Sequence, residues 1–364
     1  MSFPLIALLV LSQAPADRAP SFDTALVAQL DEGVPAWLEQ YGEPGLALVL
    51  VEDGHVTHHR AYGLADRASG RQVTPDTVFQ VGSISKTFTA WAVMELVEQG
   101  RVELDAPVDR YLKRWHLPES EYDAAGVTVR RLLEHTAGIS LPSVSGHDLG
   151  EPLPTLVEEL DRYVRIEHEP GAGHVYSGGG YALLQLLIED VTGEDFAEHL
   201  QAKVFAPLGM SSTHFGWSAA LAERVATPYG EGEEEPYPHR CFPALAAAGA
   251  YTTVRDLGAF LEAHFLGPEG AKPGRVVLAE DVLESMWATS PASPRYGLGY
   301  EVPPPAPTSR VVMHSGSNRG WKADFFALPD DGLGIAVVTN VDGGRTRLEV
   351  VKAWRDAVVQ RGGH

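Results

Sequence analysis

Apolar positions near the start of the chain follow the period of a helix and then that of a β hairpin. Residues 22–41 carry apolar side chains at helical spacing. The apolar run 46–51 predicts a buried strand, and Asp53-Gly54 is a strong two-residue hairpin signal. Residues 55–61 should return antiparallel to that strand. The chain is therefore expected to open with a helix and a hairpin.

The pattern turns helical in the middle of the chain and returns to strands near its end. A helical period runs over 84–100 and stops at Gly100, which fits a C-terminal cap. Further helices, punctuated by Pro and Gly, are expected at 128–135, 154–164, 181–192, 196–205 and 254–265. Strands are expected at 297–302, 310–313, 321–328 and 334–339, and a closing helix at 348–359.

Strands at both ends with helices between them predict an α+β fold. An antiparallel sheet would be assembled from the two chain ends, about 22–82 and 295–364, and flanked by the N- and C-terminal helices. A mostly helical region, about 83–294, would be inserted between them. Because no stretch resembles a long linker, residues 17–364 are expected to form a single unit, and 364 residues with 44% hydrophobic content suffice for a large core.

Composition narrows the classes of partner. The formal net charge of −21 argues against nucleic acid and against anionic membrane surfaces, because both require Lys and Arg. A single cysteine excludes a disulfide within the chain. The neighbouring histidines His58-His59, and His168 with His174, lack supporting ligands at metal-binding spacing, so neither a metal nor a cofactor is expected.

The N-terminus has the features of a signal peptide. Residues 3–11 form an apolar run too short to span a bilayer, and Ala14-Pro15-Ala16 resembles a cleavage site. Residues 1–16 are therefore expected to be removed on export to the periplasm or the exterior, leaving no integral membrane segment. The run has no Lys or Arg before it, and the alternative is a buried N-terminal element in a cytoplasmic protein.

Ser83-Ile84-Ser85-Lys86 is the first candidate for chemistry. A spacing of three places Ser83 and Lys86 on one helix face, and a serine at the start of a helix lies where the dipole favours a developing alkoxide. A serine hydroxyl needs a neighbour to take its proton, and a lysine can do so when its ammonium is destabilised. On these residues alone, a helix-capping Ser83 with a solvated Lys86 is an equal alternative.

The surrounding segment, 79–90, resembles the nucleophile segment of the family that contains class C β-lactamases, D-alanyl-D-alanine carboxypeptidases and β-lactamase-like esterases. Other segments that resemble this family follow in the same order, at 132–139, 170–184, 207–215, 248–257, 296–300 and 314–316. The resemblance covers roughly residues 22–340. The motifs taken together are specific for this family, although no single motif is. It implies a single catalytic unit with the cleft between sheet and helical regions.

The resemblance also implies roles. Ser83 would be the acylated nucleophile, and Lys86 and Tyr176 would share the proton transfers, with the identity of the base left open. His314-Ser315-Gly316 stands in the place of the family's Lys-Thr-Gly strand, which borders the cleft. The backbone N–H groups of Ser317 and Ser83 would form the oxyanion hole. A histidine is mostly neutral at pH 7, so His314 would attract a substrate carboxylate less than lysine does.

One position departs from the family pattern. The family's tyrosine motif is usually Tyr-x-Asn, and this chain has Gly178 where the asparagine would bind the acyl-side amide of the substrate. A missing donor to a buried amide costs about 1–3 kcal/mol, roughly ten- to a hundredfold in rate. The departure favours esters, and the three glycines 178–180 predict a loose loop.

The expected function is therefore that of a serine hydrolase that acts through an acyl-enzyme on a small-molecule ester, amide or peptide, most simply an esterase or a peptidase-like enzyme. One alternative is a D-amino-acid-specific peptidase or a true β-lactamase. Another is a weakly active or non-catalytic binding protein on the same fold. The sequence leaves the natural substrate and the oligomeric state open.

Overall fold

The computed structural model describes residues 22–362, apart from 142, 268–269 and 305–308. The predicted signal peptide, 1–16, lies outside the described residues. Among the described helices none is long and apolar enough to cross a membrane.

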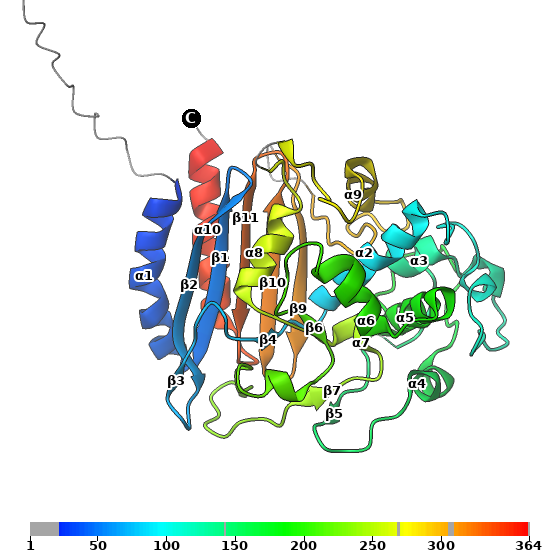
Figure 1. The fold of residues 1–364 in the computed structure, drawn as a ribbon, viewed down its shortest axis with the longest axis horizontal. Coiled ribbons are helices and arrows are strands. Elements are labelled where there is room, and N and C mark those ends of the chain that lie inside the picture. The colour runs from blue at the N-terminus through cyan, green and yellow to red at the C-terminus, as the bar shows by residue number, and fades with distance from the viewer. Residues whose placement is uncertain (1–21, 142, 268–269, 305–308, 363–364) are drawn as a thin grey trace, which may run out of the picture.

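A six-stranded antiparallel sheet forms one half of the molecule, in the order β3-β2-β1-β11-β10-β9 (Figure 1). Its strands come from both ends of the chain: β1 (Gly45–Glu52), β2 (His55–Asp66), β3 (Arg71–Gln72), β9 (Val312–Asn318), β10 (Trp321–Leu328) and β11 (Leu333–Thr339). The strand β11 pairs with β1, and this pairing joins the two ends into one sheet. The predicted α+β class and antiparallel sheet are confirmed.

Helices cover both faces of the sheet. The terminal helices α1 (Phe22–Tyr41) and α10 (Arg345–Gly362) pack side by side on one face, and α8 (Val254–Glu262) lies on the other (Figure 1). Alternate residues of β1 therefore enter two different cores: Leu46, Leu48 and Leu50 face the terminal helices, whereas Ala47 and Val49 face the larger core. Burial on both faces explains why this strand reads as a continuous apolar run.

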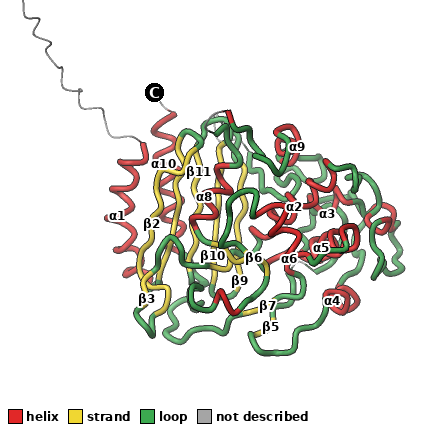
Figure 2. Tube along the Cα trace, viewed as in Figure 1, coloured by secondary structure: helices red, strands yellow, loops and turns green. Residues whose placement is uncertain are grey.

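The rest of the chain forms the helical half, shown in red to one side of the yellow sheet in Figure 2. Its α-helices are α2 (Ile84–Glu98), α3 (Val129–Leu133), α4 (Leu156–Tyr163), α5 (Gly178–Thr192), α6 (Phe196–Leu200), α7 (Leu245–Ala248) and α9 (Glu280–Met286). Shorter helical turns lie at Val108–Arg110, Ala124–Gly126, Gln201–Phe205 and Ala219–Leu221. The helix α2 is buried from Ile84 to Leu96, so it forms the centre of this half.

Two small sheets lie outside the six-stranded sheet. One contains β4 (Phe79–Gln80), β8 (Ala250–Thr252) and β6 (His214–Phe215), and the other pairs β5 (His147–Asp148) with β7 (Arg240–Cys241). The chain passes directly from β4 into α2, so the small sheet fixes the start of the central helix.

Two sequence predictions of secondary structure are wrong in detail. The segment 297–302 is not a strand: it turns back on itself through Gly299, whose φ is +83°, and contributes only isolated bridges at Tyr296 and Glu301. The strand expected at 310–313 runs instead over Val312–Asn318, because pairing with β10 extends it through polar residues of low strand propensity.

Candidate active site

Ser83 lies at the turn between β4 and α2, where it is partly accessible. Gly82 before it has a φ of +51°, and a Cβ there would come within 2.6 Å of the backbone nitrogen of Ser317, so the turn requires glycine. Ser83 occupies the N-cap position of α2, but its side chain makes no capping hydrogen bond. The capping role that was an alternative from sequence is therefore not its role in the structure.

Lys86 is buried beneath Ser83, with 2% of its surface exposed. Its Nζ donates to the carbonyl of Ala247 at 2.7 Å and to Ser83 Oγ at 3.3 Å. The ammonium also lies over the rings of Tyr176 and Tyr181, 4.9 and 5.6 Å from their centroids. Lys86 is thus held against the serine hydroxyl, and the alternative of a solvated side chain is wrong.

Tyr176 is held over Lys86 by the segment that leads into α5. Its ring packs on that of His135, with centroids 4.3 Å apart. His135 Nδ1 accepts the backbone N–H of Ser177 at 3.1 Å, and burial together with the charge of Lys86 holds the pKa of His135 well below its usual range. A neutral His135 is therefore a permanent acceptor that fixes the residue after Tyr176.

The edge strand β9 borders Ser83. Met313 exchanges backbone hydrogen bonds with Glu301, and the N–H of Ser315 donates to the carboxylate of Glu301 at 3.1 Å. Because backbone groups alternate along a strand, the N–H of Ser317 points to the same outer edge. Gly316 has no room for a Cβ, which would collide with the carbonyl oxygen of Val81. This close approach brings the backbone N–H groups of Ser317 and Ser83 next to each other.

His314 is buried, and both of its ring nitrogens are engaged. Its Nδ1 donates to the carbonyl of Ser315 at 2.6 Å, and its Nε2 accepts the hydroxyl of Tyr296 at 2.8 Å, a tautomer assigned from these partners. Burial lowers the pKa of His314 to about 4, against the opposing charge of Glu301 and with a smaller contribution from Lys86. The side chain at this position is thus neutral and presents no charge to the cleft.

We expect His314 to make the fold sensitive to acid. Its pKa rises from about 4 in the folded chain to about 6.5 in the unfolded chain, so between these values only the unfolded chain binds the proton. Its contribution to stability is present above pH 6.5 and declines as the pH falls towards 4, by about 2 kcal/mol between pH 7 and pH 5.

Urea unfolding at pH 7 and pH 5 measures this contribution. His314→Gln should lower stability at pH 7 yet lose about 2 kcal/mol less than the wild type on acidification. Other buried histidines, such as His264 with a pKa of about 4, remain in both proteins. An equal loss in the two proteins would contradict the assignment.

A cavity of about 300 Å³ opens beside Ser83. Its lining consists of Ser83, Tyr176, Glu301, His314, Ser315, Gly316, Ser317, Lys322 and Arg347. Lys322 Nζ donates to Ser317 Oγ at 2.6 Å, and Arg347 pairs with Asp324, whose pKa is raised to about 6 by burial. Sequence reasoning missed Glu301, Lys322 and Arg347. Of these three, only Lys322 could have been found from the sequence, because the turn at 318–321 between the two strands places it opposite Ser317.

Gly178 does not line this cavity. It is the first residue of α5, and its N–H donates to the carbonyl of Leu141 at 2.8 Å. A Cβ there would lie 3.1 Å from Val144 Cγ1 and 3.3 Å from Val144 N, so Val144 crowds the space where a side chain would begin. The three glycines are buried in the first turn of the helix, capped by Ser177, and the predicted loose loop is wrong.

The structure therefore brings together seven of the eight residues expected from sequence to form the site: Ser83, Lys86, Tyr176, His314, Ser315, Gly316 and Ser317. A serine hydroxyl that contacts a buried ammonium, beside two backbone N–H donors and an open cavity, can carry out acyl transfer.

Known proteins are similar to this chain in sequence. The model of the family described as Beta-lactamase matches residues 24–359. Esterase EstB from Burkholderia gladioli is 29% identical over 94% of this chain and 97% of its own length. Penicillin-binding protein 4 from Amycolatopsis lactamdurans is 32% identical over 86% of this chain and 85% of its own length.

A solved structure has a similar fold. The octameric penicillin-binding protein homologue from Pyrococcus abyssi superposes with a TM-score of 0.71 at 25% identity, covering 86% of this chain and 73% of that one. The resemblance found from the sequence motifs is confirmed. Since the family model spans nearly the whole described chain, the protein belongs to the Beta-lactamase family of hydrolases.

Proposed function

We propose that this protein is an esterase that forms an acyl-enzyme on Ser83. The observation that carries the proposal is the contact between the buried ammonium of Lys86 and the Ser83 hydroxyl, at 3.3 Å, on the floor of an open cavity. A non-catalytic binding protein has no need to bury a lysine against an accessible serine, because such burial is costly without a compensating role.

The geometry suggests how each step proceeds. Ser83 Oγ attacks the ester carbonyl carbon as its proton passes to the Lys86–Tyr176 pair, which can take it only as an amine beside a phenol or as an ammonium beside a phenolate. The carbonyl oxygen becomes an oxyanion, which the N–H groups of Ser83 and Ser317 stabilise. The carbon–oxygen bond to the alcohol then breaks, and the alcohol leaves with a proton from the same pair. Water attacks the acyl-Ser83 ester in the second half, with the proton transfers repeated, and releases the acid.

Two features support esters as the substrates. Gly178 offers no side-chain amide to hold an acyl-side amide group, and a Cβ at this position would lie only 3.1 Å from Val144 Cγ1. The relative matched over almost its whole length is named an esterase. Because other relatives are named penicillin-binding proteins, a D-amino-acid-specific peptidase or a β-lactamase is the second candidate function.

A comparison of two chromogenic substrates tests this preference. We expect kcat/KM for p-nitrophenyl butyrate, divided by the uncatalysed hydrolysis rate, to exceed the corresponding ratio for nitrocefin by about 100-fold, the upper cost of an absent amide donor. Gly178→Asn alone should narrow the gap by less than about tenfold, because a Cβ at residue 178 would lie 3.1 Å from Val144 Cγ1 and Val144 must shift to admit it. The double variant Gly178→Asn/Val144→Gly should narrow it by about tenfold. Equal ratios in the wild type would contradict an esterase.

A further inference from the structure

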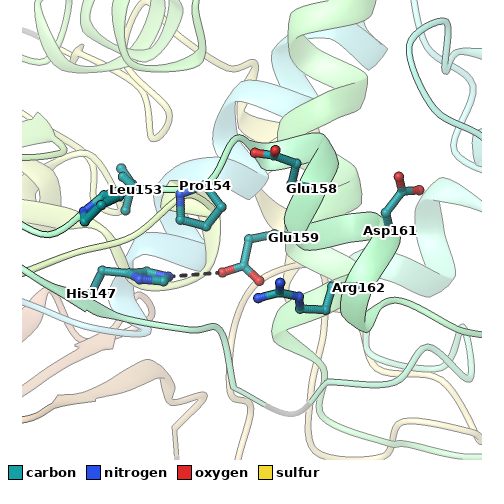
Figure 3. A pocket seen from close by; sticks show the side chains of 8 residues that line it. His147, Leu153, Pro154, Glu158, Glu159, Asp161 and Arg162 are labelled. Atoms are coloured by element: carbon teal, nitrogen blue, oxygen red, sulfur yellow. Dashed lines mark ion pairs between the residues drawn. The ribbon is translucent and has the colours of Figure 1, made fainter.

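A second cavity, of about 700 Å³, lies between the 147–154 segment and α4 (Figure 3). Its lining consists of His147, Pro152, Leu153, Pro154, Glu158, Glu159, Asp161 and Arg162, none of which lines the cavity at Ser83. In Figure 3 the side chains of His147 and Glu159 point toward each other. The catalytic scheme uses none of these residues.

Glu159 is buried at this cavity, and its partner among the described residues is His147, in an ion pair that forms only when the histidine is protonated. It is 5% exposed, its Oε1 lies 3.6 Å from His147 Nε2, and within the described part of the chain its Oε2 has no hydrogen-bond partner. His147 Nε2 also lacks a hydrogen bond there. Burying a carboxylate without donors is unfavourable, and a ligand with a charged donor would relieve this through Oε1, because Oε2 is fully covered by protein atoms.

The other two carboxylates of the cavity are already engaged. Glu158 accepts the backbone N–H of Thr155 at 2.8 Å in the capping box of α4, and Asp161 accepts the indole N–H of Trp115 at 2.6 Å. The guanidinium of Arg162 forms no ion pair within 4 Å among the contacts of the described residues, although it lines the cavity. Of the three carboxylates, Glu159 is thus the one whose oxygens accept no hydrogen bond from the described residues.

The surroundings of Glu159 select the kind of ligand. The described residues contain no group of three or more His, Cys, Asp and Glu side chains that could hold a metal ion. The lining also includes three apolar residues, Pro152, Leu153 and Pro154, and Leu153 is 48% exposed. A guanidinium presents paired N–H donors that match a carboxylate, and an aliphatic stem would cover these apolar residues.

We propose that this cavity binds an organic cation, a guanidinium or ammonium group on an aliphatic stem, with Glu159 as its anionic partner. The site adjoins the loop that also supports the catalytic side. The carbonyl of Leu141 in that loop accepts the N–H groups of Gly178 and Gly179, and His147 at its other end pairs with Cys241 of β7. An occupant would therefore contact the same loop that packs against the residues after Tyr176.

Calorimetric titration with n-butylguanidine tests the proposal, with n-butylurea as the uncharged probe of the same shape. The titration can use the Ser83→Ala protein in place of the wild type, so that no reaction at Ser83 contributes to the measured heat. We expect butylguanidine to bind with a Kd on the order of 1 mM and butylurea at least about tenfold more weakly. Glu159→Gln should weaken butylguanidine to the level of butylurea.

Two further variants keep the result interpretable. Glu169→Gln removes an equal charge at an exposed position outside the cavity, and binding should be unchanged. Leu153→Ser alters the exposed apolar lining and should weaken butylguanidine severalfold even if Glu159→Gln fails to fold. Equal binding of the two probes, or equal binding of butylguanidine by wild type and by both cavity variants, would overturn the proposal.

Discussion

Ser83→Ala is expected to reduce kcat/KM for p-nitrophenyl butyrate by about 10⁴-fold or more, because no other group can form the acyl-enzyme. The Ser83 hydroxyl makes no capping hydrogen bond, and Lys86 keeps its 2.7 Å hydrogen bond to Ala247 when the 3.3 Å contact with Ser83 is lost, so the free energy of unfolding should change little. Loss of activity in a protein of unchanged stability would therefore report chemistry. The N–H of residue 83 remains in the variant, and some substrate binding should persist.

Covalent labelling separates this role from a merely structural one. A fluorophosphonate should add one label to the wild type, on the peptide that contains Ser83, and none to Ser83→Ala. The matched control is Ser285→Ala, an exposed serine on α9 whose hydroxyl donates only to the carbonyl of Val282. It should label and turn over like the wild type. Labelling of Ser83→Ala at the wild-type rate would refute the acyl-enzyme at this residue.

The sequence predicts the large elements of the fold because their periods are long enough to read. The terminal helix at 22–41, the 46–61 hairpin and the 321–339 hairpin all appear where the apolar pattern places them. The small sheet of β4, β6 and β8 was not predicted, because strands of two or three residues carry no period. Ser315 to Asn318 belong to β9 only because β10 pairs with them.

The candidate site, like the fold, could be predicted from the sequence only in part. Helical spacing alone predicts that Ser83 and Lys86 share a face, but the burial of Lys86 depends on Ala247 and Tyr181, which lie far away along the chain. Tyr176 could be found only through the resemblance to a family. Arg347 had no signal, because its place at the cavity depends on the packing of α10 on the sheet and on its ion pair with Asp324 of β10.

Lys86→Met is expected to lower kcat/KM for the same ester by about 10³-fold, which is the usual size of a general-base contribution. Methionine is unbranched and apolar, so it can fill the buried space that Lys86 occupies while removing the nitrogen that contacts Ser83 Oγ. Lys352→Met, which removes an exposed lysine paired with Asp356 on α10, is the matched control and should leave activity unchanged. Activity within tenfold of the wild type would exclude Lys86 from the proton transfers.

The rates of the same variant on two different esters separate the roles of Lys86 and Tyr176 in the proton transfers. An ethyl ester needs a proton on its departing alkoxide, whereas p-nitrophenolate leaves without one. If Lys86 takes the proton from Ser83, Lys86→Met slows both esters equally and slows fluorophosphonate labelling to the same degree. If Tyr176 delivers the proton to the leaving group, Tyr176→Phe slows the ethyl ester by at least about tenfold more than the p-nitrophenyl ester. The reverse pattern would make Tyr176 the base and leave Lys86 to hold its ring in place, as the 4.9 Å contact between them would allow.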